Sequence, residues 1–395
     1  MVHSYNRKHA FAGDARNLRP TAMLTFTPSR LHLRLALFVA GCIWMIPASA
    51  QDPEFTLFDQ NPTYLNPALT GLFGAEWNGF GQDNCSRLIL QHRQQWNNLA
   101  GDYATSYVSY DHILPAIKGG GIGGYVLHDV AGQGVLTTTR IAGQGSKSVR
   151  IGRRVKAALG LEFSFNQKSL DWSRLSFPDM IDPQYGFVYG TSISPNQAQG
   201  TNYTDVSAGL SVIYSLRKPG PRKEPQLHFG MAAHHIDEPN ESLFEGPSRL
   251  PVKFTGYAMV NLYIQDRVSL RTGTFYRRQG EFQHILLGGT IKFESQQENG
   301  AGFGFWYRGM PSTQYSDAII GNFTWFRPNF QLNFNWDFTY SDLRPTTAPE
   351  LNMVMTIPCD TKSIQRRLEK NRIWRLLTCP SCRWARNDAK HRSRN

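Results

Sequence analysis

Strict alternation of aromatic and polar side chains marks the segment from Asn329 to Tyr340, NFQLNFNWDFTY. Its aromatic and apolar positions are Phe330, Leu332, Phe334, Trp336, Phe338 and Tyr340, and the positions between them are polar. Because successive side chains of a strand point to opposite faces, this pattern predicts a strand with one aromatic and one amide-rich face. A tilted strand needs about 9–11 residues to cross a bilayer with its apolar face in lipid.

The same two-residue period recurs from Arg87 onward, with turn-forming residues between the repeats. It predicts strands near residues 87–95, 103–112, 120–129, 134–146, 154–167, 203–215, 225–236, 252–263, 267–278, 282–294, 300–308, 316–327, 329–340 and 349–357. Two connections, 168–202 and 237–251, are long, and others such as Gly132-Gln133 are short. An even number of strands with alternating short and long connections is typical of outer-membrane barrels.

The pattern therefore predicts an all-β fold, a single transmembrane antiparallel β-barrel of about 14 strands. A soluble two-sheet sandwich is the alternative, but its strands are shorter and its buried face is richer in valine and isoleucine. No apolar helix remains after a leader peptide is removed, and every backbone group in lipid must be paired. A closed sheet is then the remaining way to cross the membrane.

The ends of the chain differ from its body, and we expect four segments. Residues 1–50 have a basic flank, an apolar run and a small-x-small end, which predict a signal peptide cleaved after Ala50. Met23 is an alternative start. Val39-Ala40-Gly41-Cys42 resembles a lipoprotein box, but the apolar run continues beyond Cys42, so plain cleavage is favoured.

The other three segments are 51–86, 87–358 and 359–395. Residues 51–86 hold two Asn-Pro pairs and several apolar anchors, which predict a plug or periplasmic segment packed on the barrel. Residues 87–358 form the predicted barrel, and residues 359–395 form a basic periplasmic tail.

The net charge of +12 is concentrated at the two ends. Residues 1–50 carry +5 and residues 361–395 carry +9, so residues 51–360 carry −2. This distribution argues against a nucleic-acid-binding body. The basic tail is suited to anionic lipid headgroups, the cell wall or a partner protein, and a disordered extension is the alternative.

Five arginines lie within predicted strands, namely Arg93, Arg140, Arg271, Arg277 and Arg308. A charged side chain that faces lipid at mid-bilayer costs about 2–4 kcal/mol, so we expect these arginines in the lumen or near an interface. Pairing with acidic residues across the lumen is the structural role, and binding a partner's acidic or backbone groups is the alternative.

Candidate chemistry is sparse, and we expect no enzyme, no cofactor and no metal site. Residues 119–124, GGGIGG, are followed by a strand pattern rather than the helix that a dinucleotide fingerprint requires. His234 and His235 are adjacent, which would send their rings to opposite faces of a strand. Cys379 and Cys382 could bind zinc with Cys359 as a third ligand, or form a disulfide. No G-x-S-x-G elbow is present.

Several ordered signatures resemble the PorP/SprF family of type IX secretion and gliding outer-membrane proteins. They are Asp52-Pro53-x-Phe55, Asn61-Pro62-x-Tyr64-Leu65-Asn66-Pro67-Ala68, Arg93-Gln94-Gln95-Trp96, Phe177-Pro178-Asp179-Met180-Ile181-Asp182-Pro183-x-Tyr185-Gly186-Phe187, Tyr203-x-Asp205-Val206-Ser207-Ala208-Gly209, Gly230-Met231-Ala232-Ala233-His234-His235, Pro239-Asn240-Glu241-Ser242, Trp306-Tyr307-Arg308 and Cys379-Pro380. The resemblance covers nearly the whole chain after the predicted signal peptide. Asn84-Cys85-Ser86, ahead of the first predicted strand, and the tail beyond Cys379-Pro380 depart from the family pattern.

The resemblance implies a fourteen-stranded barrel in the outer membrane of a Gram-negative, Bacteroidetes-like cell. It implies binding and anchoring or delivery of secreted adhesins through their C-terminal sorting domain, with other type IX secretion components and membrane lipid as further partners. An outer-membrane channel for hydrophobic or small solutes is the alternative, because fatty-acid channels carry a similar Asn-Pro-Ala hatch. The motif residues that the resemblance assigns to binding are Asn61, Pro62, Tyr64, Leu65, Asn66, Pro67, Arg93 and Trp96.

Overall fold

The computed structural model describes residues 52–73, 84–95, 103–114, 117–132, 136–190, 200–216, 225–243, 246–265, 267–295, 299–311, 315–339 and 346–359. The predicted signal peptide, Trp96, Cys379, Cys382 and the rest of the tail from residue 360 lie outside these residues. Within the described part of the chain, none of the helices is both long and apolar enough to cross a membrane.

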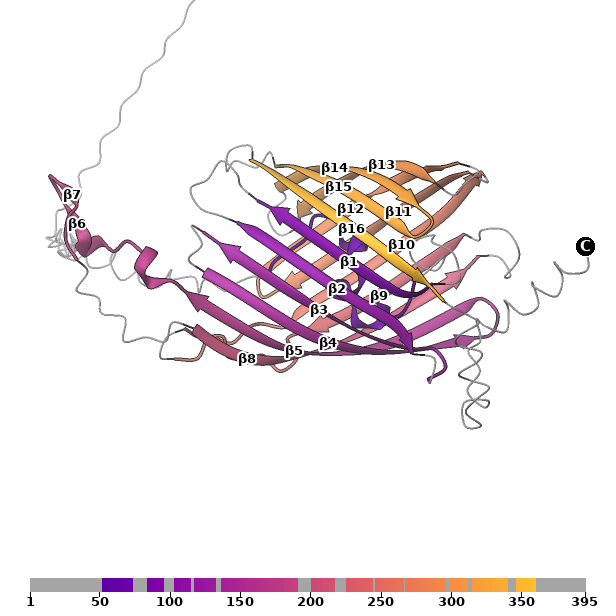
Figure 1. The fold of residues 1–395 in the computed structure, drawn as a ribbon, viewed down its shortest axis with the longest axis horizontal. Helices are drawn as coiled ribbons and strands as arrows, with labels where there is room; N and C mark the ends of the chain where they lie inside the picture. The colour runs from indigo at the N-terminus through magenta and orange to yellow at the C-terminus, as the bar shows by residue number, and fades with distance from the viewer. Residues whose placement is uncertain are drawn as a thin grey trace, which may run out of the picture. The chain divides into compact units, whose positions relative to one another are not determined.

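Fourteen of the described strands form one closed antiparallel barrel, in which neighbours in the chain are neighbours in the sheet (Figure 1). They are β1 (Asn84–Gln94), β2 (Ala104–Leu114), β3 (Gly120–Ala131), β4 (Leu136–Ile151), β5 (Val155–Leu170), β8 (Gly200–Ser215), β9 (Gln226–His234), β10 (Lys253–Gln265), β11 (Val268–Gln279), β12 (Phe282–Glu294), β13 (Gly300–Met310), β14 (Tyr315–Arg327), β15 (Phe330–Thr339) and β16 (Thr346–Pro358). Each corresponds to one predicted strand, so the predicted fold class is confirmed.

The faces of β15 are those that its alternation predicts. Asn333, Asn335 and Asp337 are buried inside the barrel, whereas Phe334 and Phe338 are exposed on its outer surface. Inside, Asn333 Nδ2 donates to Asn352 Oδ1 at 2.8 Å, which continues the amide layer onto β16. The barrel thus has an apolar exterior and a hydrogen-bonded polar interior, the arrangement that a bilayer requires.

The two ends of the barrel differ in their connections. We call the end where β1 begins and β16 ends the terminal end, and the opposite end the loop end. The two longest connections, residues 171–199 and 235–252, lie at the loop end. The first contains two 3-10 helices, η3 (Trp172–Arg174) and η4 (Pro178–Met180), and the hairpin of β6 (Ile181–Asp182) and β7 (Gly186–Phe187). Because outer-membrane barrels have short periplasmic turns and longer outer loops, we expect the terminal end to face the periplasm.

A disulfide joins Cys85 in β1 to Cys359, the residue after β16. These two strands pair along the seam where the barrel closes, from Asn84 opposite Pro358 onward. The expectation that Cys85 precedes the first strand was wrong, because β1 begins at Asn84. The alternative in which Cys359 is a third zinc ligand is excluded, because its sulfur is bonded to Cys85.

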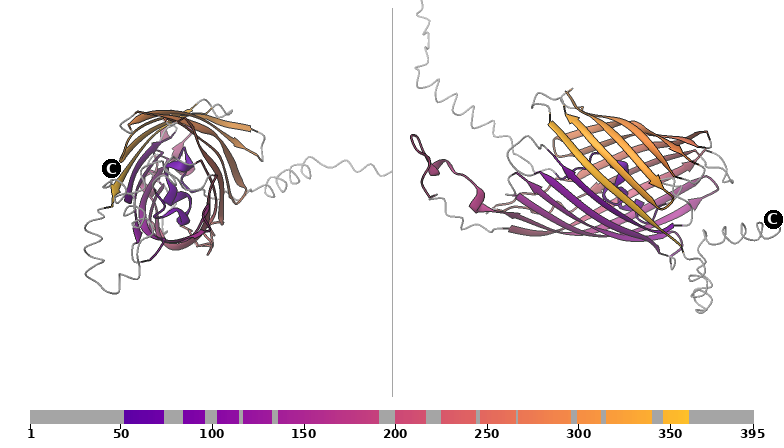
Figure 2. Two further views of the ribbon diagram at one scale, coloured as in Figure 1. Left: turned by 90° about the vertical axis from the view of Figure 1, so that its right-hand side faces the viewer. Right: turned by 45° about the horizontal axis from the view of Figure 1, so that its top comes forward.

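Residues 52–73 lie inside the barrel, and we call this segment the plug (Figure 2, indigo). It contains three short helices, η1 (Phe58–Gln60), α2 (Pro62–Leu65) and η2 (Pro67–Leu69). Phe58 stacks on Phe275 with ring centroids 5.1 Å apart and meets Trp306 edge-on at 5.8 Å. The apolar core of the protein therefore lies between the plug and the inner wall of the barrel.

Candidate functional site in the barrel lumen

The two Asn-Pro pairs start two of the plug's three helices, α2 and η2. Pro62 and Pro67 each occupy a first helical position, where a missing N–H is not needed. The Asn66 side chain accepts a hydrogen bond from the Ala68 N–H at 2.9 Å and so caps η2. The repeated motif thus folds the plug into short, compact turns.

The same Asn66 side chain fixes the plug to the wall. Its Nδ2 donates to the carbonyl of Leu210 in β8 at 2.9 Å and to that of Met231 in β9 at 3.1 Å. Leu210 and Met231 are directly paired across the two strands. One buried amide therefore contacts both strands of this pair and the plug's own backbone, which satisfies its donors and its acceptor together.

Two wall glycines make room for this turn. A Cβ on Gly209 would overlap the Asn66 side chain, and a Cβ on Gly160 would overlap the backbone of Pro67 and Ala68. Gly209 belongs to the Tyr203–Gly209 signature, so two motifs far apart in the sequence meet here. Close backbone approach, which glycine permits, explains why the plug can rest directly on the strands.

Asp52 enters a cluster of cations near the loop end. Its carboxylate is bonded to Lys253 Nζ, lies 2.8 Å from His235 Nε2 and 3.9 Å from Arg140 Nη1. Burial alone would raise the pKa of Asp52, but the charges of His235 and Lys253 hold that pKa well below its ordinary value. The beginning of the plug is therefore held by ion pairs to three elements of the wall and loops.

Glu54 and Asp59 make the same kind of contact with other strands. Glu54 Oε1 lies 2.6 Å from His284 Nε2, and Glu54 Oε2 lies 3.6 Å from Arg277 Nη1. Burial opposes ionisation, yet these two cations lower the pKa of Glu54 far below its ordinary value. Asp59 Oδ2 accepts from Arg271 Nη1 at 3.2 Å. Each of these acids pairs with a cation from a strand more than 200 residues away.

Arg93 joins the plug to the seam side of the barrel. It donates to the Glu54 carbonyl and, at 2.9 Å, to Asp337 Oδ2 of β15. Arg308 Nη1 also lies 2.9 Å from the same oxygen. All five strand arginines lie in the lumen and pair with carboxylates, so the expected structural role is confirmed.

Tyr64 lies in an aromatic cluster at the centre of the plug. Its ring meets Phe55 at 5.3 Å and Tyr107 at 6.0 Å, both edge-on, and its hydroxyl donates to the Pro53 carbonyl at 2.6 Å. Lys253 Nζ lies 5.0 Å from the ring centroid. Tyr64 therefore ties the first turn of the plug to its helices and to the wall.

The structure brings seven of the eight predicted binding residues together in the plug and the wall around it; they are Asn61, Pro62, Tyr64, Leu65, Asn66, Pro67 and Arg93. Their contacts are with the barrel itself, and their role toward a partner stays a prediction. Sequence reasoning missed the partners Asp52, Asp59, Gly160 and Lys253. Three acids in the plug and several cations in the strands were the available signal.

The structure also tests two further interpretations of the sequence, at the adjacent histidines and at the glycine-rich segment. The rings of His234 and His235 are both buried, so the expected opposite orientation was wrong: β9 ends at His234, and His235 turns inward with φ 58°. The glycines of residues 119–124 extend into β3, where Gly121 lies against Thr70 of the plug, as expected for a crowded strand. Among the described residues, no cluster of three metal-ligating side chains occurs.

An apolar hollow of about 40 Å³ remains between the plug and strands β9 to β11. Its lining includes Phe55, Phe58, Leu65 and Phe275. A cavity of this volume is well below the roughly 300–1,000 Å³ that is typical of small-molecule sites.

The family model described as "Type IX secretion system membrane protein PorP/SprF" matches residues 48–353. No curated protein sequence matches the chain. The CymD monoaromatic hydrocarbon channel is similar in structure at a TM-score of 0.44 and 10% identity, over 76% of this chain and 93% of that chain. The toluene transporter TbuX of Ralstonia pickettii gives 0.41 and 10%, over 75% and 92%. The outer membrane protein Omp33 of Acinetobacter baumannii gives 0.38 and 9%, over 70% and 100%.

Proposed function

Because the chain belongs to the PorP/SprF family of type IX secretion system membrane proteins, we propose that this outer-membrane barrel binds secreted adhesins through their C-terminal sorting domain. In this proposal the barrel anchors the adhesin at the cell surface or delivers it there. Other components of the same secretion system are its further partners.

The observation that carries the proposal is a lumen filled by a plug that is bonded to opposite parts of the wall. Thr63 shares a 2.6 Å hydrogen bond with Tyr107 of β2, Asp59 pairs with Arg271 of β11, and Gln60 bonds to Asn335 of β15. Because the plug occupies the lumen, a partner would contact this barrel at its ends. Such a barrel is suited to act as a binding scaffold.

The loop end offers a surface of suitable chemistry. The β6–β7 hairpin exposes Tyr185, Phe187 and Tyr189, whose exposed fractions are 76%, 64% and 56%. Asp182 fixes this hairpin by accepting from the N–H groups of Gln184 and Tyr185 at 2.8 and 3.0 Å. Clustered exposed apolar side chains on an ordered loop are typical of protein interaction sites.

An open strand edge lies close by in sequence. β9 pairs with β8 only from Ala208 onward, so Gly200–Asp205 has β5 as its strand partner within the described part of the chain. An extended segment of a partner can add to such an edge through main-chain hydrogen bonds. The edge and the aromatic hairpin together favour a β-rich partner domain.

Co-purification tests the proposal. The detergent-solubilised barrel is mixed with a purified adhesin sorting domain, and retention is compared with that of the triple variant Tyr185→Ser, Phe187→Ser, Tyr189→Ser. We expect retention by the native barrel and at least tenfold weaker binding by the variant, because aromatic anchors dominate interface energies. The exposed Ile181→Ser variant, on the same hairpin, controls for general loss of apolar surface. Persistent surface display of all adhesins after gene deletion would contradict the anchoring role.

The Asn66-Pro67-Ala68 turn of the plug supports a second candidate function, a channel for hydrophobic or small solutes. Planar-bilayer conductance separates the two candidates, with the full protein compared to a variant that lacks residues 51–71. A closed full-length barrel that opens only without the plug supports the scaffold. An open ohmic pore in the full protein favours transport.

A further inference from the structure

Basic side chains gather on one side of the terminal end, where β3 begins and β4 turns into β5. Residues 117–124 and 145–156 hold six Lys/Arg and no Asp/Glu. We call these six residues the cationic rim; they are Lys118, Lys147, Arg150, Arg153, Arg154 and Lys156. The neighbouring turn, residues 217–224, lies outside the described residues and adds four Lys/Arg and one Glu in sequence. The net charge on this side of the barrel is therefore strongly positive.

The acids closest to the rim in sequence lie elsewhere. Asp111 and Glu162 are buried in the lumen, where each pairs with an arginine, at 2.8 and 2.9 Å. Asp129 is at the loop end of β3. Glu294, at the terminal end of β12, belongs to the far side of the barrel. These four acids leave the positive charge of the rim in place.

Two cations of the rim contact neutral groups. Lys147 Nζ donates to the Lys118 carbonyl, and Arg154 Nη1 lies 3.5 Å from the Tyr214 hydroxyl. Arg153 is exposed in the turn between β4 and β5. Within the described part of the chain, no ion pair joins Lys147, Arg153 or Arg154 to a carboxylate.

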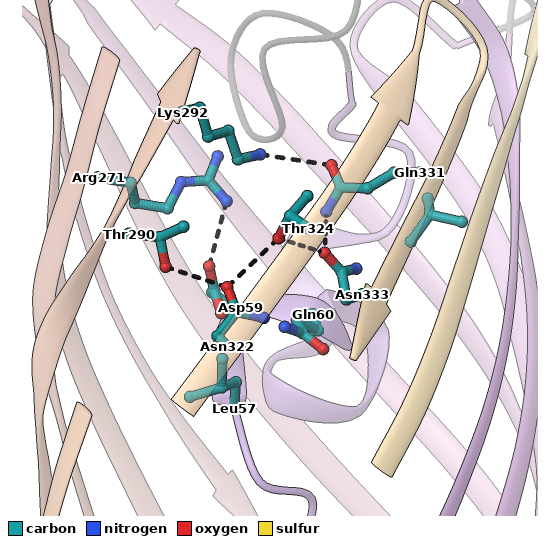
Figure 3. Close-up of a pocket in the computed structure, with 11 residues that line it drawn as sticks. Leu57, Asp59, Gln60, Arg271, Thr290, Lys292, Asn322, Thr324, Gln331 and Asn333 are labelled. Atoms are coloured by element: carbon teal, nitrogen blue, oxygen red, sulfur yellow. Dashed lines mark hydrogen bonds and ion pairs between the residues drawn. The ribbon is translucent and has the colours of Figure 1, made fainter. Parts of the chain in front are cut away.

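Other cations near this end already have partners. Arg150 and Lys156 are opposite each other across the hairpin and make contacts of their own. In the lumen, Figure 3 shows Arg271 directed at Asp59, whose carboxylate is 3.2 Å away. Lys147 and the two arginines of the turn are therefore the cations that can bind an external anion.

The rim shares the lipid-facing surface of the β4–β5 hairpin with apolar side chains. Along β4, Ser148 is buried on the inner side, whereas Lys147, Val149 and Ile151 are exposed on the outer side. The exposed fractions of Val149 and Ile151 are 55% and 60%, and Leu159, opposite Lys147 on β5, is 64% exposed. A lysine among apolar neighbours extends its ammonium toward water, and here it reaches the turn that precedes β3. The Lys147 ammonium therefore lies where the wall leaves the bilayer.

Arg154 reaches the same outer surface on the next strand. Tyr214 is opposite Val155 in the β5–β8 pair, and Ile213 beside it is buried on the inner side. The Tyr214 ring therefore belongs to the outer face, where tyrosines are enriched at the membrane–water interface. Because the Arg154 guanidinium lies next to the Tyr214 hydroxyl, it is at the level of the lipid headgroups.

We propose that the cationic rim binds anionic phospholipids of the membrane leaflet at the terminal end. Lys147, Arg153 and Arg154 contact the phosphates, and Val149 and Ile151 contact the acyl chains. Ammonium and guanidinium groups form strong, charge-assisted hydrogen bonds with phosphate oxygens. Each basic side chain at an anionic membrane surface strengthens binding about fivefold.

A lipid fits this surface better than an acidic protein does. The cations alternate with apolar side chains that continue the lipid-facing surface of β4 and β5, so both halves of a phospholipid find matching groups. An acidic protein in the water phase would leave Val149 and Ile151 uncovered. The proposal does not depend on the sorting-domain function and can hold or fail separately from it.

Native mass spectrometry of the full chain in detergent tests the proposal, with equimolar phosphatidylglycerol and phosphatidylcholine of the same acyl chains as competing probes. We expect the native protein to retain the anionic lipid at least tenfold more than the zwitterionic one, and to lose this preference as salt rises. Equal retention of the two lipids at low salt would overturn the lipid assignment and leave the rim to an acidic protein partner.

Variants locate the site. The triple variant Lys147→Gln, Arg153→Gln, Arg154→Gln should lose most of the preference, and Lys147→Arg, Arg153→Lys, Arg154→Lys, which keeps the charge, should retain it. Its matched control, Arg249→Gln with Arg278→Gln, removes exposed charges at the loop end and should leave the preference unchanged.

The apolar half of the site has its own test. Val149→Ser with Ile151→Ser should lower retention of both lipids and leave their ratio unchanged, because it removes only acyl-chain contacts. A preference that persists in the triple glutamine variant, or one that falls equally in the loop-end control, would refute the assignment to the rim.

Discussion

Gly209 lies so close to Asn66 that adding a single methyl group at Gly209 tests how the plug is held against the wall. In Gly209→Ala, the new Cβ would lie 2.8 Å from Asn66 Cγ and 3.1 Å from Pro67 Cδ. Ordinary contacts between carbon atoms are about 3.5–4.0 Å, so the Asn66 side chain has to move by about 1 Å. A displacement of this size breaks its bonds to the Leu210 and Met231 carbonyls, which are 2.9 and 3.1 Å long.

The expected free-energy change follows from these contacts. Two lost hydrogen bonds contribute about 0.5–1.5 kcal/mol each. Overpacking of a tight site adds about 1–3 kcal/mol. The docked state of the plug is then destabilised by about 2–6 kcal/mol, which corresponds to at least a 30-fold rise in its undocked population. The ion pairs of Asp52, Glu54 and Asp59 remain, so the plug is loosened rather than lost.

Hydrogen–deuterium exchange of residues 62–70 in the detergent-solubilised barrel measures this population. We expect exchange at these amides to be at least about 30-fold faster in Gly209→Ala, with the strands unchanged. Gly145→Ala is the matched control, because a Cβ on Gly145 of β4 meets no atom within 4 Å. Native exchange rates in Gly209→Ala would refute the close-approach argument.

Three further predictions concern the seam, pH and the outer face. Reduction of Cys85–Cys359, or Cys85→Ser, should lower the free energy of unfolding by up to about 5 kcal/mol, because the bond closes a loop with a sequence separation of 274. Gel mobility after heating with and without reductant measures this loss of stability. Equal melting of the oxidised and reduced barrels would contradict the prediction. The lowered pKa values of Asp52 and Glu54 mean that their contribution to plug docking is complete above their ordinary values of 3.8 and 4.5 and is lost as pH falls below them. Exchange at residues 52–60 should therefore rise below about pH 4, and exchange that stays constant down to about pH 2 would count against the ion pairs. Burial would lower the pKa of His235, but Asp52 raises it above its ordinary value of 6.5, so the His235–Asp52 contribution should be lost as pH rises through that raised value. Leu161→Arg places a charge on the outer face of β5, where Leu161 is 66% exposed. This charge should destabilise the barrel in lipid vesicles by about 2–4 kcal/mol. An unchanged unfolding midpoint would argue against lipid contact at this face.

The strands could be predicted from the sequence because their signal is local. Alternation within β15, for example, records which side of the wall each residue occupies, and no distant contact is needed to interpret it. The expected luminal place of Arg93 and Arg140 follows from the same physics, since lipid excludes charge.

The contacts that hold the plug to the barrel wall could not be predicted, because they join residues that are distant in the sequence. Asp52 and Lys253 are separated by 201 residues, and nothing near either position indicates the other. The burial of His235 depends on a left-handed turn after β9 that alternation does not indicate. Pairing of Cys85 with Cys359 becomes evident only once closure makes the first and last strands neighbours.

The covalent link at the seam makes the barrel wall a ring that cannot unzip between its first and last strands while the bond is intact. Any sideways exit from the lumen into the bilayer has to use another junction. The junction of β8 with β9 has only eight paired positions, from Ala208–Ala233 to Ser215–Gln226, and the plug's amide already sits across it. The wall would therefore separate first between β8 and β9, while the disulfide-linked β1–β16 seam stays closed.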